Sequence, residues 1–511
     1  MKRREPGDLL EECLGRGIGE FVVCAGARNA PLVMAILQVE GAGVWNHFEE
    51  RGAGFFALGR TMATGKPCAV VTTSGTAVAE LLPAVIEAHY QQRPLVLITA
   101  DRPARFRGTG APQAIAQEGI FGVYAATELS GWDGRGPLHL NVELEEDEAI
   151  PAMRPGHDRG RFETPRLKID VSDAVRFLRA DRFKGIVALL GGLEASERED
   201  AYHFLKAIGV PVLADATSGM REALGKLALA DGNRLLRERP PQKVLRIGDI
   251  PVGRFWRDLD ELPDVEVCSL TRTGLPGLAR ESIVVHGEID RLLRGMGEVE
   301  SIGDVDDHLP ESARRRARLD ELLARFPDSE PAMMRELSVF ASVGEEVFLG
   351  NSLPIREWNE FAQVTMPVVN VRASRGANGI DGQLSTWLGA TAGLAGAWGI
   401  FGDLTVLYDL AAPAMLEQEG RMQRVLAVIN NGGGRIFERL PRMQGMDARQ
   451  AAVMANAHQT GFGPWAAMWG MDHVRVASRD EFEIDPGPGT TVLEICPDRA
   501  QTEAFWAEWQ S

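Results

Sequence analysis

Two residue pairs in the C-terminal third of the sequence could together bind a metal ion and a phosphate group. Gly402-Asp403 ends one apolar run, and Asn430-Asn431 ends another, 27 positions after Asp403. Asp403 offers a carboxylate, Asn431 an amide oxygen, and Gly433, within a run of three glycines, a backbone carbonyl. A hard cation such as Mg²⁺ prefers oxygen ligands, and glycines let the backbone approach a diphosphate closely. Taken alone, the two pairs could equally be ordinary turns at strand ends.

The spacing of the two pairs resembles the binding motif of thiamine-diphosphate enzymes, in which Gly-Asp is followed downstream by Asn-Asn. Such enzymes also need a carboxylic acid beside N1′ of the cofactor's aminopyrimidine. A desolvated glutamate, whose pKa is raised by burial, suits that task. The candidate is Glu50, within the segment from His47 to Gly59.

Around Glu50 the likeness becomes specific to one family. The sequence resembles the MenD family, the 2-succinyl-5-enolpyruvyl-6-hydroxy-3-cyclohexene-1-carboxylate synthases of menaquinone biosynthesis. Matching stretches follow one another in the same order in all parts of the chain, with the weakest match in the middle. They are Gly26–Leu32, His47–Gly59, Thr73–Ala77, Thr99–Pro103, Gln113–Gln117, Gly248–Arg254, Asn351–Arg356, Arg375–Gly382, Gly402–Leu404 and Asn430–Pro441.

The resemblance implies a three-domain α/β fold, each domain a mainly parallel sheet flanked by helices. The expected domains are a pyrimidine-binding domain at 1–155, a central domain at 167–310 and a diphosphate-binding domain at 329–511. The implied cofactors are thiamine diphosphate and Mg²⁺ or Mn²⁺, with active sites at the subunit interface of a homodimer or homotetramer. The implied enzyme is a transferase that decarboxylates 2-oxoglutarate and adds the succinyl carbanion equivalent to isochorismate in a Stetter-like 1,4-addition.

The matched motifs also imply roles for single residues. Both substrates are dicarboxylates, and arginine forks suit carboxylates, so local cations must overcome a net charge of −17. Ser352 and Arg356 are expected at the succinyl carboxylate, Arg28, Arg102 and Gln113 on the isochorismate side, and Arg375 at either substrate. The catalytic set is Glu50, Gln113, Ser352, Arg356 and Arg375. Further substrate contacts are expected from Arg254, Ile436, Phe437 and Leu440, cofactor contacts from Glu50, Ile380, Gly402, Asp403, Leu404 and Asn431, and metal ligands from Asp403, Asn431 and Gly433.

Four positions depart from the family pattern. Ala27 replaces a usual serine, and Pro112 stands where asparagine is common. Asn378 replaces a serine, and Phe255 replaces the second member of a Lys-Arg pair. Proline removes a backbone donor as well as the amide side chain. We therefore expect rearranged substrate contacts, with cofactor binding less affected.

Other functions fit the sequence less well. Another thiamine-diphosphate 2-oxoacid decarboxylase or carboligase, such as an acetolactate-synthase or oxalyl-CoA-decarboxylase relative, would lack the Ser352, Arg356 and Arg375 arrangement. Some of these enzymes also bind a nucleotide in the central domain. A non-enzymatic paralogue would be expected to lose Glu50 or a metal ligand, and none is lost. A dinucleotide-dependent dehydrogenase needs a fuller glycine fingerprint than Gly191-Gly192, which we interpret as a tight turn.

The elements that must position these residues are short apolar runs bounded by turn residues, which is the pattern of buried parallel strands. Helical patterns lie between the runs, so right-handed strand–helix–strand units are expected. The segments 77–89 and 311–326 are expected to be helical, 388–401 a closely packed helix leading into a strand, and 154–166 a linker. Strands are expected at 21–25, 68–73, 95–100, 185–190, 243–247, 346–349, 400–403, 425–429 and 491–495.

Length and composition agree with this organisation. A chain of 511 residues has room for about three domains. With 55 basic against 72 acidic residues, it offers no basic face for nucleic acid or for an anionic membrane. Five scattered cysteines without a Cys-x-x-Cys pair indicate reduced thiols in a cytoplasm. No signal peptide or membrane-spanning segment is evident, so a cytoplasmic protein is expected.

Overall fold

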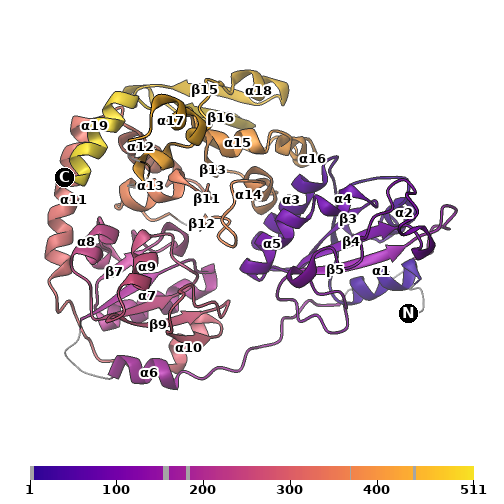
Figure 1. Ribbon diagram of the computed structural model, residues 1–511, viewed down its shortest axis with the longest axis horizontal. Coiled ribbons are helices and arrows are strands. Elements are labelled where there is room, and N and C mark those ends of the chain that lie inside the picture. The colour runs from indigo at the N-terminus through magenta and orange to yellow at the C-terminus, as the bar shows by residue number, and fades with distance from the viewer. Residues whose placement is uncertain (1–4, 154–159, 180–184, 369, 441–442, 444) are drawn as a thin grey trace. The chain divides into compact units, whose positions relative to one another are not determined.

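The computed structural model describes residues 5–153, 160–179, 185–368, 370–440, 443 and 445–511 (Figure 1). Part of the expected linker, 154–159, and Pro441 of the last matched stretch lie outside these residues. The chain divides into two compact units. The first comprises Met1–Pro165, Ser374–Ala395 and Leu404–Met422, and the second Arg166–Ala373, Gly396–Asp403 and Gln423–Ser511.

The first unit is built on a five-stranded sheet in the order β2-β1-β3-β4-β5, in which every pairing is parallel. Apolar side chains of these strands form its core with residues of the first two helices. The strands are β1 (Glu20–Val23), β2 (Gly43–Asn46), β3 (Cys68–Thr72), β4 (Leu95–Asp101) and β5 (Leu138–Glu143). The helices are α1 (Pro6–Gly15), α2 (Ala30–Ile36), α3 (Glu50–Thr64), α4 (Thr76–Ala79), α5 (Leu82–Gln91), α14 (Gln383–Ala390), most of α15 (Asp403–Tyr408) and α16 (Leu416–Glu419).

One expected helix, 77–89, is wrong as a single element. The chain forms α4 and then starts again as α5, with Pro83 in the first turn of the second helix. Proline has no N–H to donate to the preceding turn and its ring crowds the carbonyl four residues earlier, so a continuous helix is unfavourable there. The same proline is well suited to the start of a new helix.

The second unit holds two more parallel sheets. Their orders are β10-β9-β8-β6-β7 and β12-β11-β13-β14-β16-β15. The strands are β6 (Ile186–Leu190), β7 (Val212–Ala214), β8 (Lys243–Ile247), β9 (Glu266–Thr271), β10 (Ile283–His286), β11 (Glu346–Leu349), β12 (Val371–Arg372), β13 (Ala397–Gly402), β14 (Arg424–Ile429), β15 (Asp472–Val476) and β16 (Thr490–Ile495). The helices are α6 (Ser172–Arg179), α7 (Arg198–Ile208), α8 (Gly232–Glu238), α9 (Arg254–Asp258), α10 (Ile289–Gly295), α11 (His308–Arg325), α12 (Glu330–Ala341), α13 (Leu353–Phe361), α17 (Ala448–Ala455), α18 (Gly463–Met468) and α19 (Arg499–Gln510).

The nine expected strands are confirmed, with ends that differ by a few residues. Their burial explains why they could be found. The strands β3, β4, β6, β8, β11, β14 and β16 are buried along their whole length, and each contains a run of apolar residues. The helix expected at 311–326 is also present, as α11. The α/β class with three mainly parallel sheets is therefore correct.

Each sheet has a reversal point, where consecutive strands are added in opposite directions, and ligands of parallel α/β sheets bind beyond the carboxyl ends of the strands there. In the first sheet this point lies between β1 and β3. In the second it lies between β6 and β8, and in the third between β11 and β13. Five matched stretches, Gly26–Leu32, Thr73–Ala77, Gly248–Arg254, Asn351–Arg356 and Gly402–Leu404, lie at the carboxyl ends of these strands, where ligands are expected.

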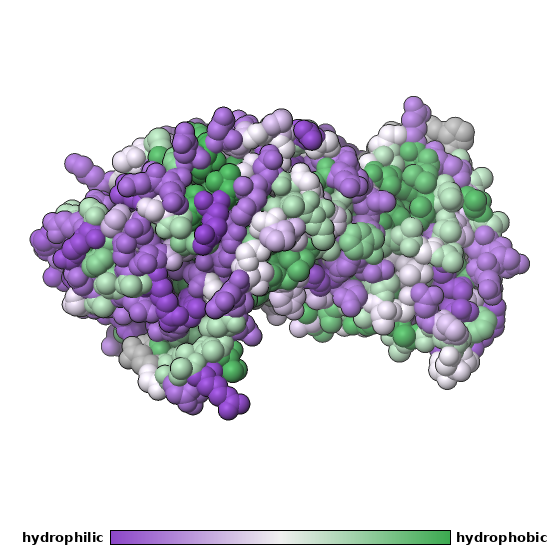
Figure 2. Space-filling view, turned by 90° about the horizontal axis from the view of Figure 1, so that it is seen from above, coloured by the Kyte–Doolittle hydropathy of each residue, from purple (hydrophilic) through white to green (hydrophobic). Residues whose placement is uncertain are grey.

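The face seen in Figure 2 is a mixture of hydrophilic and hydrophobic residues, with several apolar patches among the hydrophilic ones. No described helix combines the length and the apolar composition needed to cross a membrane. Four of the five cysteine thiols are buried, and Cys496 is half-buried.

Candidate functional site

Asp403 directly follows β13 at the reversal point of the third sheet, and its carboxylate is buried at 2% exposure. Its Oδ2 accepts hydrogen bonds from the backbone N–H groups of Gly432 (2.9 Å) and Gly433 (2.8 Å). His458 Nε2 lies 3.2 Å from the same oxygen. These contacts tie the end of β13 to the glycine turn after β14. Gly433 is required here, since its φ is +126° and a Cβ would lie 2.4 Å from the Ala455 carbonyl oxygen.

The two asparagines after β14 have different environments. Asn430 Nδ2 donates to Glu494 Oε1 (2.6 Å) and to the Thr460 carbonyl (2.8 Å), so this side chain is used inside the protein. Asn431 Nδ2 donates to both carboxylate oxygens of Glu330, at 3.0 and 3.2 Å. Among the described residues, the buried Asn431 Oδ1 has no hydrogen-bond partner.

This arrangement fits a divalent cation bound with a diphosphate. Asp403 could supply a carboxylate, the turn at Gly433 a carbonyl, and Asn431 an amide oxygen that accepts no hydrogen bond from the described residues. In the described part of the chain, no cluster of three or more His, Cys, Asp or Glu side chains could hold a metal by itself. A set of few protein oxygens suits Mg²⁺, which usually keeps water or phosphate oxygens in its remaining positions.

Ser352 and Arg356 meet at the start of α13, which follows β11 on the other side of the same reversal point. Ser352 has a φ of +73°, an uncommon conformation for a residue with a side chain. Arg356 donates from Nη1 to the Ser352 carbonyl. This contact holds the guanidinium one helical turn from Ser352.

The remaining candidates of the second unit fall in two places. Ile436, Phe437 and Leu440 follow the glycine turn and are half-buried, so they are not core residues. Arg254 begins α9 and pairs with Asp258 of the same helix at 3.3 Å, with half of its side chain exposed. No described contact joins Arg254 to the Ser352–Arg356 pair.

In the first unit, Glu50 begins α3 beyond the carboxyl end of β2, next to β1. Glu49 caps this helix, accepting hydrogen bonds from the N–H groups of Arg51 (3.0 Å) and Gly52 (2.8 Å). The Glu50 carboxyl is half-buried, and this partial desolvation raises its pKa. A backbone hydrogen bond opposes the shift, and the Glu49 carboxylate adds to it. The direction is that expected for the acid that works on an aminopyrimidine.

Arg28, Arg102 and Gln113 come together near the carboxyl ends of β1 and β4. Partial burial and the positive charge of Arg102 lower the pKa of Arg28. Arg102 donates from Nε to the Pro112 carbonyl at 2.8 Å, beside Gln113. Gln113 has a φ of +58° and packs so closely on Gly75 that a Cβ there would lie 3.2 Å from its Cα. The carboxylates of Asp101, Glu145 and Glu146 act on Arg28 as well, but two neighbouring guanidinium groups remain suited to an anionic ligand.

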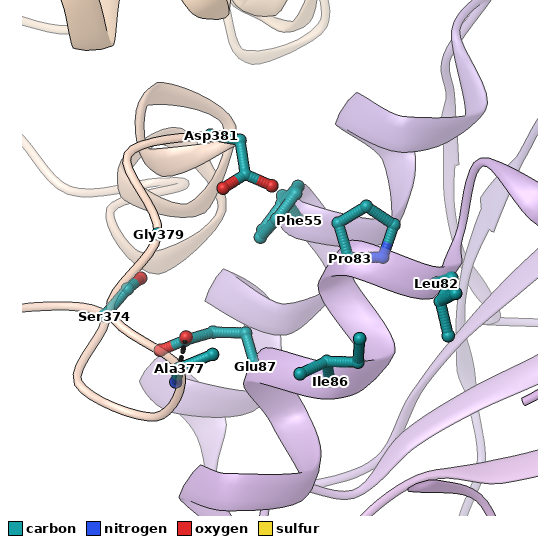
Figure 3. Close-up of a pocket in the computed structure, with 9 residues that line it drawn as sticks. All are labelled: Phe55, Leu82, Pro83, Ile86, Glu87, Ser374, Ala377, Gly379 and Asp381. Atoms are coloured by element: carbon teal, nitrogen blue, oxygen red, sulfur yellow. Dashed lines mark hydrogen bonds between the residues drawn. The ribbon is translucent and has the colours of Figure 1, made fainter. Parts of the chain in front are cut away.

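Arg375 and Ile380 lie on a loop that the buried side chain of Glu87 anchors to α5 (Figure 3). The Glu87 carboxylate accepts hydrogen bonds from three successive backbone N–H groups of the loop, at residues 376 (2.6 Å), 377 (2.7 Å) and 378 (3.2 Å). Gln91 Nε2 donates to it as well, at 2.6 Å. A pocket of about 280 Å³ lies between this loop and the helices α3 and α5. Its lining residues are Phe55, Leu82, Pro83, Ile86, Glu87, Ser374, Ala377, Gly379 and Asp381.

The structure gives physical reasons for two of the four family departures, Asn378 and Phe255. Asn378 has a φ of +65°, and asparagine tolerates the left-handed region better than most residues. Pro112 lacks an N–H, but its carbonyl still accepts from Arg102. Phe255 is fully buried in the core of the central sheet, where a second cation would be costly. Nothing in the structure explains Ala27.

At the reversal point of the central sheet, the turn after β6 packs directly against the turn after β8. A Cβ on Gly191 would lie 1.9 Å from the Asp249 carbonyl oxygen, and one on Gly192 would lie 3.1 Å from Asp249 Oδ2. Arg272 also faces this point and pairs with Asp249 (3.3 Å) and Glu194 (3.7 Å). The glycines thus allow two turns to touch, in agreement with the tight turn predicted at Gly191-Gly192.

Three supporting residues were not found from the sequence. Asn29 holds the turn before Arg28, accepting from the Gly26 N–H (2.7 Å) and donating to the Cys24 carbonyl (2.9 Å). Glu87 and Glu330 act as acceptors for groups far away in the chain. Only Asn29 could have been found from the sequence, because an asparagine followed closely by Pro31 is a typical start of a helix.

Comparison with known proteins gives first the class and then the family. Residues 5–120 match the family described as "Thiamine pyrophosphate enzyme, N-terminal TPP binding domain". An X-ray structure assigned to a thiamin diphosphate-dependent enzyme isolated from Mycobacterium smegmatis matches with a TM-score of 0.70 and 15% identity, covering 97% of this chain and 99% of that one. The fold is therefore that of a thiamine-diphosphate-dependent enzyme.

Two curated relatives extend over nearly the whole chain, and both are named 2-succinyl-5-enolpyruvyl-6-hydroxy-3-cyclohexene-1-carboxylate synthase. The one from Akkermansia muciniphila is 47% identical, covering 97% of this chain and 96% of that protein. The one from Bdellovibrio bacteriovorus is 35% identical, covering 98% and 97%. The chain belongs to the 2-succinyl-5-enolpyruvyl-6-hydroxy-3-cyclohexene-1-carboxylate synthase family.

Proposed function

We propose that the protein decarboxylates 2-oxoglutarate and joins the resulting succinyl unit to isochorismate, as a thiamine-diphosphate-dependent synthase of menaquinone biosynthesis. The observation that carries the proposal is the 47% identity to a protein of that name along 97% of the chain. The retention of Glu50, Asp403 and Asn431 supports it, since loss of any of them would suggest a non-catalytic paralogue. In the central sheet, Gly191 and Gly192 pack against the Asp249 turn, and this packing favours the proposed function over that of nucleotide-binding relatives.

Asp403, Asn431 and the Gly433 carbonyl are proposed to hold Mg²⁺ or Mn²⁺ and, through it, the cofactor diphosphate. Gly402 and Leu404 would contact the cofactor on either side of Asp403. Thiamine diphosphate, when bound, supplies the electron sink that allows a 2-oxoacid to lose carbon dioxide. Arg356, placed by the Ser352 carbonyl, would bind the distal carboxylate of 2-oxoglutarate and orient the substrate for this loss.

Glu50 is proposed to hold a proton at N1′ of the aminopyrimidine, a task favoured by its raised pKa. Ile380 would support the bent cofactor. Arg28, Arg102 and Gln113 would bind the carboxylates of isochorismate, with Arg375 available to either substrate. Arg254 would add a further substrate contact, and the half-buried Ile436, Phe437 and Leu440 would form an apolar wall that limits water.

We further propose that the protein works as a homodimer or homotetramer in the cytoplasm, with each active site built from two subunits. Large apolar side chains of the first unit support a subunit interface. Phe48, two residues before Glu50, is 68% exposed, and Tyr408 is 56% exposed. The buried or half-buried free thiols are compatible with a reducing compartment.

The direct test supplies the purified protein with thiamine diphosphate, Mg²⁺, 2-oxoglutarate and isochorismate. We expect isochorismate to disappear and a product to form whose mass equals both substrates minus CO₂. The Asp403→Ala variant is the control, since it should lose metal-dependent cofactor binding. Decarboxylation without consumption of isochorismate would refute the acceptor, and Pro112 and Phe255 would then be the first positions to examine. Cofactor binding without any reaction would refute the substrates.

Subunit complementation tests the shared active site. Mixing inactive Glu50→Gln and Asp403→Ala proteins after dissociation and reassociation should restore up to about one quarter of the activity, because half of the dimers are mixed and each contains one intact site. If both residues of a site came from one chain, the mixture would remain inactive.

A further inference from the structure

Glu330 is a buried carboxylate that is not among the predicted catalytic, binding or metal-ligating residues. It begins α12, where Ser329 caps the helix and Thr502 Oγ1 accepts from the Glu330 N–H at 2.9 Å. The residue is 2% exposed, and its backbone is therefore fixed between two helices. Arg439 Nη2 lies 4.0 Å from Glu330 Oε2 and 3.9 Å from Glu357 Oε1, so one cation is close to both carboxyl groups.

The contact between Glu330 and Asn431 defines which way the Asn431 amide faces. An amide has an NH₂ end that donates and an oxygen end that accepts, whereas an ionised carboxylate only accepts. Both Glu330 oxygens receive the Asn431 NH₂ group. Rotating the amide by half a turn would place its oxygen against the carboxylate and lose both hydrogen bonds.

The opposite end of the same amide is the second, independent observation. Asn431 Oδ1 is buried and, within the described part of the chain, accepts no hydrogen bond. Leaving a buried acceptor without a partner costs about 1–3 kcal/mol, so such an atom calls for a ligand. Asn430 provides the contrast, because its NH₂ group is bonded within the protein.

We infer that Glu330 is a positioning residue for the metal site, which holds the Asn431 amide with its oxygen directed to the cation. The inference rests on the proposed function, since it assumes that Asn431 is a metal ligand. Glu330 touches neither cation nor cofactor and acts only through Asn431. Partners of this kind orient the ligands of many protein metal sites.

The Glu330→Gln variant tests the inference in the full-length protein. Glutamine has the same shape, but its own amide can donate or accept, so the Asn431 amide is free to rotate. We expect Mn²⁺, measured by its EPR signal in the presence of thiamine diphosphate, to bind at least about tenfold more weakly. Glu360→Gln is the matched control, because Glu360 accepts from Asn233 Nδ2 at 2.8 Å in the same kind of carboxylate–amide contact but makes no described hydrogen bond to Asn431. Its Mn²⁺ affinity should stay close to that of the wild type.

A second background separates positioning from loss of structure. A carboxylate offers an oxygen in either orientation, so in the Asn431→Asp background the Glu330→Gln change should no longer weaken Mn²⁺ binding. In that background, the Glu330→Gln change should instead strengthen Mn²⁺ binding, because it relieves repulsion between two carboxylates. An equal loss in both backgrounds, or unchanged Mn²⁺ affinity of folded Glu330→Gln protein, would overturn the inference. Failure of the wild type to bind Mn²⁺ with the cofactor would instead refute the proposed metal site.

Discussion

Replacing Glu87 with alanine should release the loop that carries Arg375 and Ile380. Three successive loop N–H groups and Gln91 Nε2 would lose their common acceptor. A hydrogen bond to a charged group contributes about 1.5–3 kcal/mol, and the lower value applies here because residues 377 and 378 are exposed and recover part of the loss by bonding to water. Counting the two shortest loop contacts at the lower value gives about 3 kcal/mol of lost local stability.

A loss of about 3 kcal/mol corresponds to roughly a hundredfold faster opening, which hydrogen exchange can measure. We expect that acceleration in peptides covering 374–382, with little change in β1, β3 or β4. Gln91→Ala is the control, because it removes a donor from the same carboxylate without touching the loop. Glu87→Gln keeps one acceptor oxygen and should give an intermediate rate. If exchange at 376–378 is unchanged in folded Glu87→Ala protein, the carboxylate does not hold the loop.

Three further predictions concern the same unit. Glu50→Gln should abolish turnover while cofactor affinity, measured by calorimetry, stays near normal; near-normal turnover would contradict the assigned role. Gly59→Ala should lower the free energy of unfolding by about 1–3 kcal/mol or more, because a Cβ would lie 2.1 Å from the Thr386 carbonyl oxygen. Gly15→Ala, with no atom within 4 Å of the added carbon, is its control in urea denaturation. Burial lowers the pKa of His139 from 6.5 to about 4, so the unfolded chain binds more protons between these values and stability falls as pH falls through that window. His139→Gln should make this fall shallower by up to about 1.4 kcal/mol per pH unit, and an unaltered slope would contradict it.

The strands, and the site residues that directly follow them, could be predicted from the sequence because their causes are local. A strand buried on both faces must be apolar at nearly every position, as in β4, β6 and β14. Polar residues that end such runs in a parallel sheet must lie at its carboxyl edge. Asp403 and Asn431 follow the neighbouring strands β13 and β14, as this reasoning predicts.

Other features depended on details that hydrophobic patterns do not contain. Whether residues 77–89 form one helix or two was decided by a single proline. The central glycines at 191 and 192 could have cradled a phosphate, but in the folded chain they allow the Asp249 turn to pack against them. A glycine permits either outcome, and only its neighbours in space decide between them.

By itself, the sequence determined the α/β class, the order of the buried strands and the residue types able to bind a divalent cation and carboxylates. The tertiary structure decided which hydrogen-bond partner each of these groups has. Glu87 meets a loop 289 positions further along the chain, and Glu330 meets Asn431 101 positions away. Buried carboxylates must find donors wherever the fold brings them, and a contact between distant segments leaves no periodic trace in either one.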